Sequence, residues 1–326
     1  MFVFPGQGSQ QPGMGRFLFD NFFVVRELFG EGSEALHLDL KKLCFDSSDA
    51  DLALTENTQP ALLVTSTATS TVLKKEFGIA PQAAAGHSIG EYAALVTAEA
   101  MPFAASIRAV RTRGQAMQSA VPVGKGAMLA VLGLEPQQVQ ELCEHAVKMS
   151  GTGPLSPANF NSPGQVVISG ASGPVEWLKT SFDAEKLWGA SGPKRVKMIP
   201  LQVSAPFHCA LMAPAEQKMR EVLTAIEFKD AQFPVVQNFT AKVEQKATVL
   251  RENLIRQVSS PVLWMQSMAE AKARGWTRVI ECGTGKVLQG LLKKIDPAFQ
   301  VLTTNSLDEL KQIEQLGSRP ARSTDQ

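Results

Sequence analysis

The sequence predicts an α/β protein in which one large domain is interrupted by a small subdomain. Two observations support this prediction. Short apolar runs, such as residues 2–4 (FVF), end at glycine or proline and lie among longer helix-like segments. Residues 126–201 form a series of their own, in the order β-α-β-β-α-β. A chain of 326 residues is long enough for a large domain that carries such an insertion.

The composition is that of an ordinary globular protein. Hydrophobic residues make up 44% of the chain and charged residues 19%. The formal net charge of +1 gives no reason to expect nucleic acid or a membrane surface as a partner. No apolar run reaches the ~20 residues of a membrane helix, and the first residues lack a signal-peptide pattern. We therefore expect a cytoplasmic protein.

The four cysteines lie far apart and form no CxxC pair: Cys44, Cys143, Cys209 and Cys282. Their spacing argues against a zinc site, and the length of the chain argues against a disulfide framework. We expect reduced thiols and no bound metal.

The first third of the chain predicts two strands and two helices. The run 2–4 is a buried strand stopped by Pro5-Gly6. Residues 57–76 open with a polar cap and a proline, which is a helix start signal. Residues 83–85 (AAA) lead as a strand into 86–90 (GHSIG), and the helix-prone 91–95 follow.

The middle third predicts the inserted subdomain. We expect strands at 126–134, 154–160, 165–171 and 194–201, and helices at 136–148 and 173–188. This order is the ferredoxin-like pattern, so the α/β-hydrolase-like large domain would comprise 1–124 and 196–326, with the ferredoxin-like subdomain at 125–195. Further helices are expected at 212–228 and 261–274, and a strand at 279–280. Residues 316–326 are expected to form a frayed tail.

The string GHSIG at 86–90 makes Ser88 a candidate nucleophile. A sharp strand-to-helix turn needs small residues two before and two after the serine, as Gly86 and Gly90 are. Such a turn exposes the serine oxygen and aims the N–H groups of the next helix at developing negative charge. The alternative is a glycine-rich turn whose serine only caps the helix.

A serine nucleophile needs a base, and four histidines are available: His37, His87, His145 and His208. His208 lies in a loop before a predicted helix and follows Ser88 in chain order, as hydrolase-like sites require. A buried packing role is the alternative for His208. His37 is expected to be structural, and His145 to lie at the surface or to pack. His87, next to the serine in the turn, is expected to pack, with a supporting role behind the catalytic groups as the alternative. An ordinary histidine base would lose activity on the acid side near a pKa of about 6.5.

Arg113 lies at the edge of an apolar helical face. At helical pitch over 104–118, Ile107, Val110 and Met117 share one face, and Arg113 borders it. A buried guanidinium needs an acceptor, and its fork suits a carboxylate. A snorkelling side chain or a structural ion pair is the alternative.

Four segments together resemble the malonyl-CoA:acyl-carrier-protein transacylases. They are residues 4–10 (FPGQGSQ), 55–61 (TENTQPA), 86–91 (GHSIGE) and 206–208 (PFH). The likeness runs from Phe2 to about residue 307. It implies a Ser-His dyad with Ser88 as nucleophile and His208 as general base. It also implies oxyanion-hole N–H groups from Gln7 and Ile89, and a main-chain carbonyl of Gln257 that orients the histidine.

The same resemblance implies the substrate contacts. Gln59 would line the pocket, and Arg113 would hold the malonyl carboxylate. Phe207 agrees with selection of malonyl groups, and Asn161 would contact pantetheine, although loop chemistry alone also explains an asparagine before Ser-Pro-Gly.

The implied reaction is ping-pong transfer of malonyl from malonyl-CoA to an acyl carrier protein, without metal or redox cofactor, by a monomer. Whether the carrier serves fatty-acid or polyketide synthesis stays open. The basic residues Lys286, Lys293 and Lys294 suit either an acidic carrier or a solvated helix face. An editing acyl hydrolase and a non-catalytic carrier-docking module are the rival functions; the intact Arg113 argues against the first, and the intact Ser88 and His208 against the second.

Overall fold

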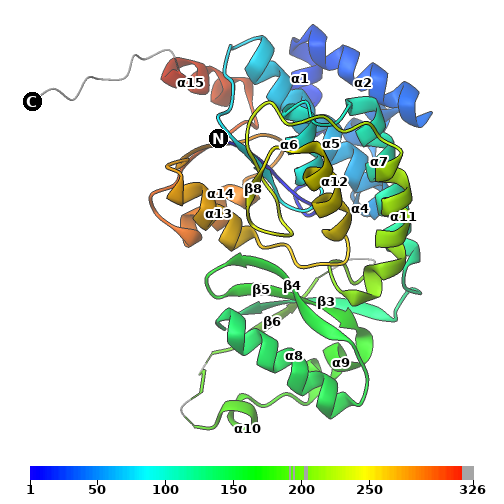
Figure 1. Ribbon diagram of the computed structural model, residues 1–326, viewed down its shortest axis with the longest axis vertical. Coiled ribbons are helices and arrows are strands. Elements are labelled where there is room, and N and C mark those ends of the chain that lie inside the picture. Colours follow the sequence, from blue (N-terminus) through cyan, green and yellow to red (C-terminus); the bar gives the residue numbers. More distant parts are fainter. Residues whose placement is uncertain (191, 194, 202–204, 318–326) are drawn as a thin grey trace, which may run out of the picture.

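The computed structural model describes residues 1–190, 192–193, 195–201 and 205–317. Within these residues the chain forms two sheets, which lie one above the other in Figure 1. The upper, larger part holds both ends of the described chain. The lower part is made of the middle third of the sequence. The predicted α/β class with an internal second sheet is confirmed.

The larger sheet is parallel except at one edge. Its order is β10-β9-β1-β2-β7-β8, and only the β7–β8 pair is antiparallel. Its central strands β1 and β2 are buried at every position, which explains why they are continuous apolar or small-residue runs. The strands are β1 (Phe2–Phe4), β2 (Ala84–Gly86), β7 (Val235–Val236), β8 (Val243–Glu244), β9 (Arg278–Glu281) and β10 (Gln300–Thr303).

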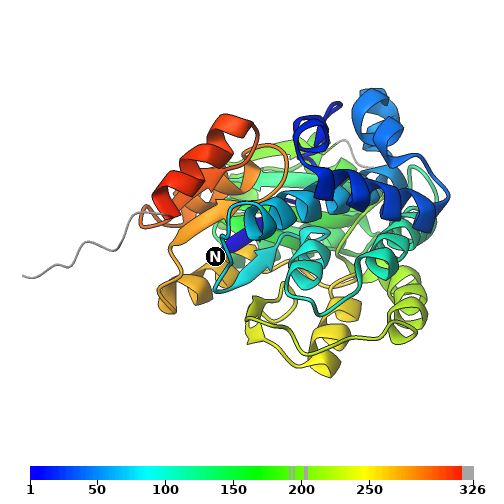
Figure 2. The same cartoon turned by 90° about the horizontal axis from the view of Figure 1, so that it is seen from above.

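Helices surround this sheet, as the view from above shows in Figure 2. Helices α5 and α7 pack so closely that a Cβ on Gly114 would lie 2.7 Å from Cα of Glu56. The helices of this part are α1 (Arg16–Asn21), α2 (Phe23–Leu36), α3 (Leu40–Asp46), α4 (Asp49–Ala53), α5 (Thr55–Lys75), α6 (Gly90–Thr97), α7 (Phe103–Ser119), α11 (Ala213–Thr224), α12 (Ala247–Arg256), α13 (Trp264–Ala273), α14 (Val287–Ile295) and α15 (Leu307–Gly317), with a 3₁₀ turn at Ala210–Met212. None of the described helices is long and apolar enough to cross a membrane.

The smaller sheet has the order β4-β5-β3-β6, with every neighbouring pair antiparallel. Its strands are β3 (Gly126–Leu132), β4 (Leu155–Ser162), β5 (Gln165–Ala171) and β6 (Lys197–Pro200). Helices α8 (Pro136–Ser150) and α9 (Ser172–Thr180) connect them and cover the face turned away from the large sheet in Figure 1. This is the connectivity of a split β-α-β unit. Because β6 pairs with β3, we propose that the subdomain ends after Pro200 rather than at residue 195.

Several predicted elements differ from the observed ones at their ends. The helix expected over 173–188 is broken into α9 and α10 (Ala184–Trp188). The helix expected from 57 begins at Thr55: the main-chain oxygen of Leu54 already accepts from the N–H groups of Asn57 and Thr58, so the first turn starts before the predicted cap. Of the expected frayed tail, residues 316–317 belong to α15, and 318–326 lie outside the described residues.

Main-chain hydrogen bonds join the small sheet to the segment before α13, in the larger part. Strand β4 pairs with Val262, just before α13: the N–H of Val262 donates to Ala158 O at 2.8 Å, and the N–H of Phe160 donates to Val262 O at 2.9 Å. The small sheet is therefore fixed against the large one beside its central strands.

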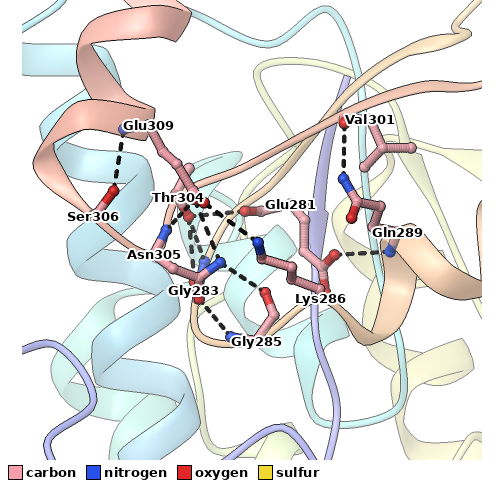
Figure 3. A network of polar contacts seen from close by, with 10 residues as sticks. All are labelled: Glu281, Gly283, Gly285, Lys286, Gln289, Val301, Thr304, Asn305, Ser306 and Glu309. Carbon is pink, nitrogen blue, oxygen red and sulfur yellow. Dashed lines mark hydrogen bonds and ion pairs between the residues drawn. The ribbon is translucent and has the colours of Figure 1, made fainter.

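A buried carboxylate organises the chain after β9 (Figure 3). Glu281 accepts hydrogen bonds from the N–H groups of Leu288 and Gln289, and so caps the start of α14. Asn305 holds the glycine-rich turn through Gly285 N–H and Gly285 O, and Lys286 pairs with Glu309. These contacts tie the loop after β9 to α14 and α15.

Candidate active site

A strained turn places Ser88 between β2 and α6. A Cβ on Gly86 would lie 1.9 Å from the carbonyl carbon of Gly90, and one on Gly90 would lie 2.2 Å from Phe4 O. Ser88 itself has a left-handed φ of +52°, which is costly for a residue with a side chain. Glycine is required on both sides, as the sequence predicted. The Ser88 side chain does not cap α6, so the alternative role of a helix cap is wrong.

His208 lies within hydrogen-bonding distance of the serine. Its Nε2 is 2.7 Å from Ser88 Oγ, and its Nδ1 is 2.9 Å from the main-chain oxygen of Gln257. A carbonyl oxygen can only accept, so Nδ1 carries the proton and Nε2 is left to accept one from Ser88. The expected dyad, with a main-chain carbonyl behind the histidine, is therefore assembled in this structure. His208 also has a positive φ, +57°.

Arg113 reaches the same atoms from α7. Its side chain is 1% exposed, so it does not snorkel. Nη2 donates to Ser88 Oγ at 3.1 Å and to Gln257 Oε1 at 3.0 Å. Within the described part of the chain Arg113 forms no ion pair, and its Nε has no hydrogen-bond partner. The guanidinium is a buried cation with spare donors, which is what an anionic substrate group would need.

Burial changes the protonation behaviour of the site. Burial, and next the positive charge of Arg113, lowers the pKa of His208 to about 3. The imidazole is therefore neutral at pH 7 and able to accept a proton. The expectation of an ordinary pKa near 6.5 is wrong for this histidine, because sequence alone shows neither the burial nor the neighbouring cation. Burial also lowers the pKa of His87 and of Arg113.

A cavity of about 100 Å³ opens beside Ser88. It brings together residues far apart in the sequence, from loops and helices around the large sheet and from the small sheet. Its lining includes the predicted Gln7, Gln59, Ile89, Arg113 and Phe207, together with Met128, Asn159 and Leu201 from the small sheet and the segment after it. Oε1 of Gln59 is buried without a hydrogen-bond partner. The cavity thus offers an unpaired polar group besides the Arg113 donors.

Asn161 lies differently from the other predicted contacts. Its Oδ1 is 2.8 Å from Nε2 of His87, and Asn159, two residues earlier, lines the cavity instead. His87 bonds to Asn161 and its ring contacts Trp264. The two remaining histidines are remote from Ser88: His37 ends α2, and His145 packs on Trp177.

Sequence reasoning missed a polar network beneath the serine. Asn238 accepts from Ser88 N at 2.7 Å and donates to Gly86 O at 2.7 Å, which holds both sides of the turn. The carboxylate of Glu91 accepts from Asn238 N and from the Gln257 side chain. The available signal was a lone acidic residue at the start of an otherwise apolar helix, 90–97.

The arrangement suits acyl transfer. A polarised serine, a neutral histidine base and a helix N-terminus converge on one cavity. Among the described residues no group of three His, Cys, Asp or Glu side chains could hold a metal ion.

Comparison with known proteins gives one consistent answer. Residues 1–300 match the family model described as the acyl transferase domain. A malonyl CoA-acyl carrier protein transacylase of Bacillus subtilis (strain 168) is 42% identical over 312 residues, or 95% of this chain and 94% of the relative. Its namesake in Escherichia coli (strain K12) is 43% identical over 308 residues, or 94% and 95%.

Solved structures agree in fold as well as sequence. An acyl carrier protein S-malonyltransferase from Vibrio cholerae has a TM-score of 0.88 at 42% identity, covering 96% of this chain and 98% of that one. A malonyl-transacylase in complex with its type II PKS acyl-carrier protein has the same score and identity, covering 97% and 98%. Family model, relatives and fold all extend over nearly the whole chain, and the chain therefore belongs to the acyl transferase family.

Proposed function

We propose that this protein transfers malonyl groups from malonyl-CoA to the phosphopantetheine thiol of an acyl carrier protein. The observation that carries the proposal is the buried guanidinium of Arg113 with Nη2 3.1 Å from Oγ of Ser88. A cation fixed beside the nucleophile favours an acyl group that carries its own carboxylate. Relatives over 40% identical and named for this reaction support the same activity.

The reaction proceeds in two transfers. Oγ of Ser88 attacks the thioester carbonyl of malonyl-CoA while Nε2 of His208 accepts its proton. The carbonyl oxygen becomes an oxyanion, which the main-chain N–H groups of Gln7 and Ile89 stabilise beside the start of α6. The intermediate collapses to a malonyl-serine ester, and CoA leaves as a thiol with the proton from His208.

The carrier's thiol then repeats these steps in reverse. His208 accepts the thiol proton as the sulfur attacks the ester carbonyl, and it returns the proton to Ser88 Oγ when the malonyl thioester leaves. Gln257 keeps the same His208 tautomer in both halves, since its carbonyl oxygen bonds Nδ1–H throughout.

The remaining roles concern substrate selection. Arg113 pairs with the malonyl carboxylate through donors that include the unpartnered Nε. Gln59 and Phe207 form the acyl pocket with Met117, and pantetheine enters past Asn159, which lines the cavity, with Asn161 two residues further along β4. No residue in this scheme requires a cofactor, and we place the reaction in the cytoplasm.

One experiment separates this function from its rivals. The intact protein is incubated briefly with malonyl-CoA and its mass is measured, then holo carrier protein is added. We expect a single malonyl adduct at Ser88 that moves to the carrier. Loss of the adduct to water alone would indicate an editing hydrolase, and no adduct at all would indicate a docking module.

A further inference from the structure

Glu91 is a buried carboxylate directly below the candidate nucleophile. It lies in the first turn of α6, is 0% exposed, and is followed in the helix by the buried residues 92–95. Burying a carboxylate without strong hydrogen-bond partners costs folding free energy, so the partners of Glu91 show what stabilises it in this position.

Three N–H groups point at this carboxylate. Oε2 accepts from Asn238 N and from Gln257 Nε2, both at 2.9 Å, and Oε1 accepts from Gln237 Nε2 at 3.1 Å. Main-chain carbonyls fix the two side-chain donors: Gln257 Nε2 also donates to Ser88 O, and Gln237 Nε2 to Leu250 O. Burial raises the pKa of Glu91, while these three N–H donors and the charge of Arg113 oppose that shift and favour the ionised carboxylate.

The Gln257 side chain connects this anion to the buried cation. Its Nε2 faces Glu91 and its Oε1 accepts from Arg113 Nη2 at 3.0 Å. Its main-chain oxygen accepts from His208 at 2.9 Å. One residue therefore holds both the proposed base and the proposed carboxylate-binding group, and Glu91 holds that residue's amide.

We propose that Glu91 is a positioning residue, which acts through the Gln257 amide to hold Arg113 where it can bind a substrate carboxylate. This inference rests on the proposed malonyl transfer. Without the Glu91 acceptor the Gln257 amide keeps its bond to Ser88 O but loses its bond to the carboxylate, so the Oε1 that accepts from Arg113 is held less firmly. The kcat/KM then falls more for a substrate whose carboxylate binds Arg113 than for a substrate without a carboxylate.

The test is a double-mutant cycle on substrate preference. The variants are Glu91→Leu, Gln257→Leu and both together, and the measured quantity is kcat/KM for malonyl-CoA divided by that for acetyl-CoA. We expect each single variant to lower this ratio about tenfold and the double variant to lower it no further, because both remove the same link. Glu91→Gln keeps an oxygen that accepts from Gln257, and should retain more of the preference than Glu91→Leu.

Glu281→Gln is the matched control, since Glu281 is another 0% exposed carboxylate that accepts from main-chain N–H groups, but at the end of β9. It should leave the ratio unchanged. Circular dichroism and a thermal melt establish folding; where Glu91→Leu does not fold, Glu91→Gln and Gln257→Leu complete the same comparison.

The experiments distinguish a failure of the positioning role from a failure of the proposed function. Unchanged ratios in folded Glu91 variants, or multiplicative losses in the double variant, overturn the positioning role alone. A wild-type protein that forms no malonyl adduct at Ser88 overturns the proposed function, and the role of Glu91 with it.

Discussion

Nη2 of Arg113 donates a hydrogen bond to Oγ of Ser88 at 3.1 Å, from a side chain that makes no ion pair within the described residues. If this guanidinium binds the malonyl carboxylate, Arg113→Ala should cost about 3–5 kcal/mol in transfer from malonyl-CoA, because a desolvated anion is left unpaired. Acetyl-CoA has no carboxylate, so its slow reaction should stay unchanged or improve.

The measurement is kcat/KM for both substrates, after circular dichroism confirms folding. Arg113→Lys keeps the charge but loses the forked guanidinium, so its kcat/KM for malonyl-CoA should lie between those of wild type and Arg113→Ala. Equal losses for malonyl-CoA and acetyl-CoA would make Arg113 structural and remove the main support for malonyl selection.

Ser88→Ala should abolish both the covalent malonyl adduct and transfer, since a methyl group cannot attack a thioester. Peptide mass mapping after incubation with malonyl-CoA checks this. A label that maps to another residue of the variant would contradict the assignment of the nucleophile.

His208→Ala should slow acylation by ~10²–10⁴-fold, the usual contribution of a positioned general base. Rapid-quench measurement of the first turnover isolates this step from carrier binding. His145→Ala is the matched control, because His145 packs on Trp177 in the small subdomain. Near-normal acylation without His208 would move the base to another residue.

The pH dependence of acylation follows from the lowered pKa of His208. With that pKa at about 3, the basic form persists well below pH 6.5, so the acid limb of wild-type acylation should lie below that value. The charge of Arg113 is one cause, so Arg113→Ala should move the limb to higher pH. First-turnover rates with acetyl-CoA measure it, with the exposed Arg108→Ala as control. An identical acid limb in wild type and Arg113→Ala would refute this coupling.

Glu281 should give the fold a pH-dependent stability. Burial raises its pKa to about 7, above the ~4.3 of an unfolded chain, so the folded state binds more protons between these values. Its contribution to the free energy of unfolding is therefore present below about pH 4 and is lost as pH rises through 7. Relative to Glu281→Gln, wild type should lose on the order of 3 kcal/mol over that interval. Urea unfolding at several pH values tests this; a constant difference would contradict it.

The sequence predicted elements best where the signal was local. The run 2–4, the helix with Pro136 at its first position and the turn with Gly86 and Gly90 all rest on short-range sterics or capping, and all appear in the structure. Strands β7 and β8 escaped prediction, because two residues each give no periodicity. Their place in the sheet depends on tertiary pairing of β7 with β2 and on pairing of β8 with β7.

The functional site likewise has residues with a local sequence signal and residues whose role depends on tertiary contacts. Turn chemistry, chain order and helical pitch made Ser88, His208 and Arg113 candidates, and the resemblance to the transacylases supplied their expected roles. The network of Glu91, Asn238 and Gln257 could not be predicted from the residues alone, because it joins three segments that meet only after folding. The low pKa of His208 was hidden for the same reason, since it arises from burial and from Arg113.

The positive φ angles of Ser88 and His208 place backbone strain, which lowers stability, at the two residues that carry out the proposed reaction. Both residues carry a side chain in a conformation that favours glycine, at the two ends of one 2.7 Å hydrogen bond. Replacing either with glycine would relax the backbone while deleting a reacting group. Selection of variants for thermal stability alone would therefore tend to favour substitutions at these two positions, and those variants would be inactive. Engineering for stability has to keep Ser88 and His208 unchanged.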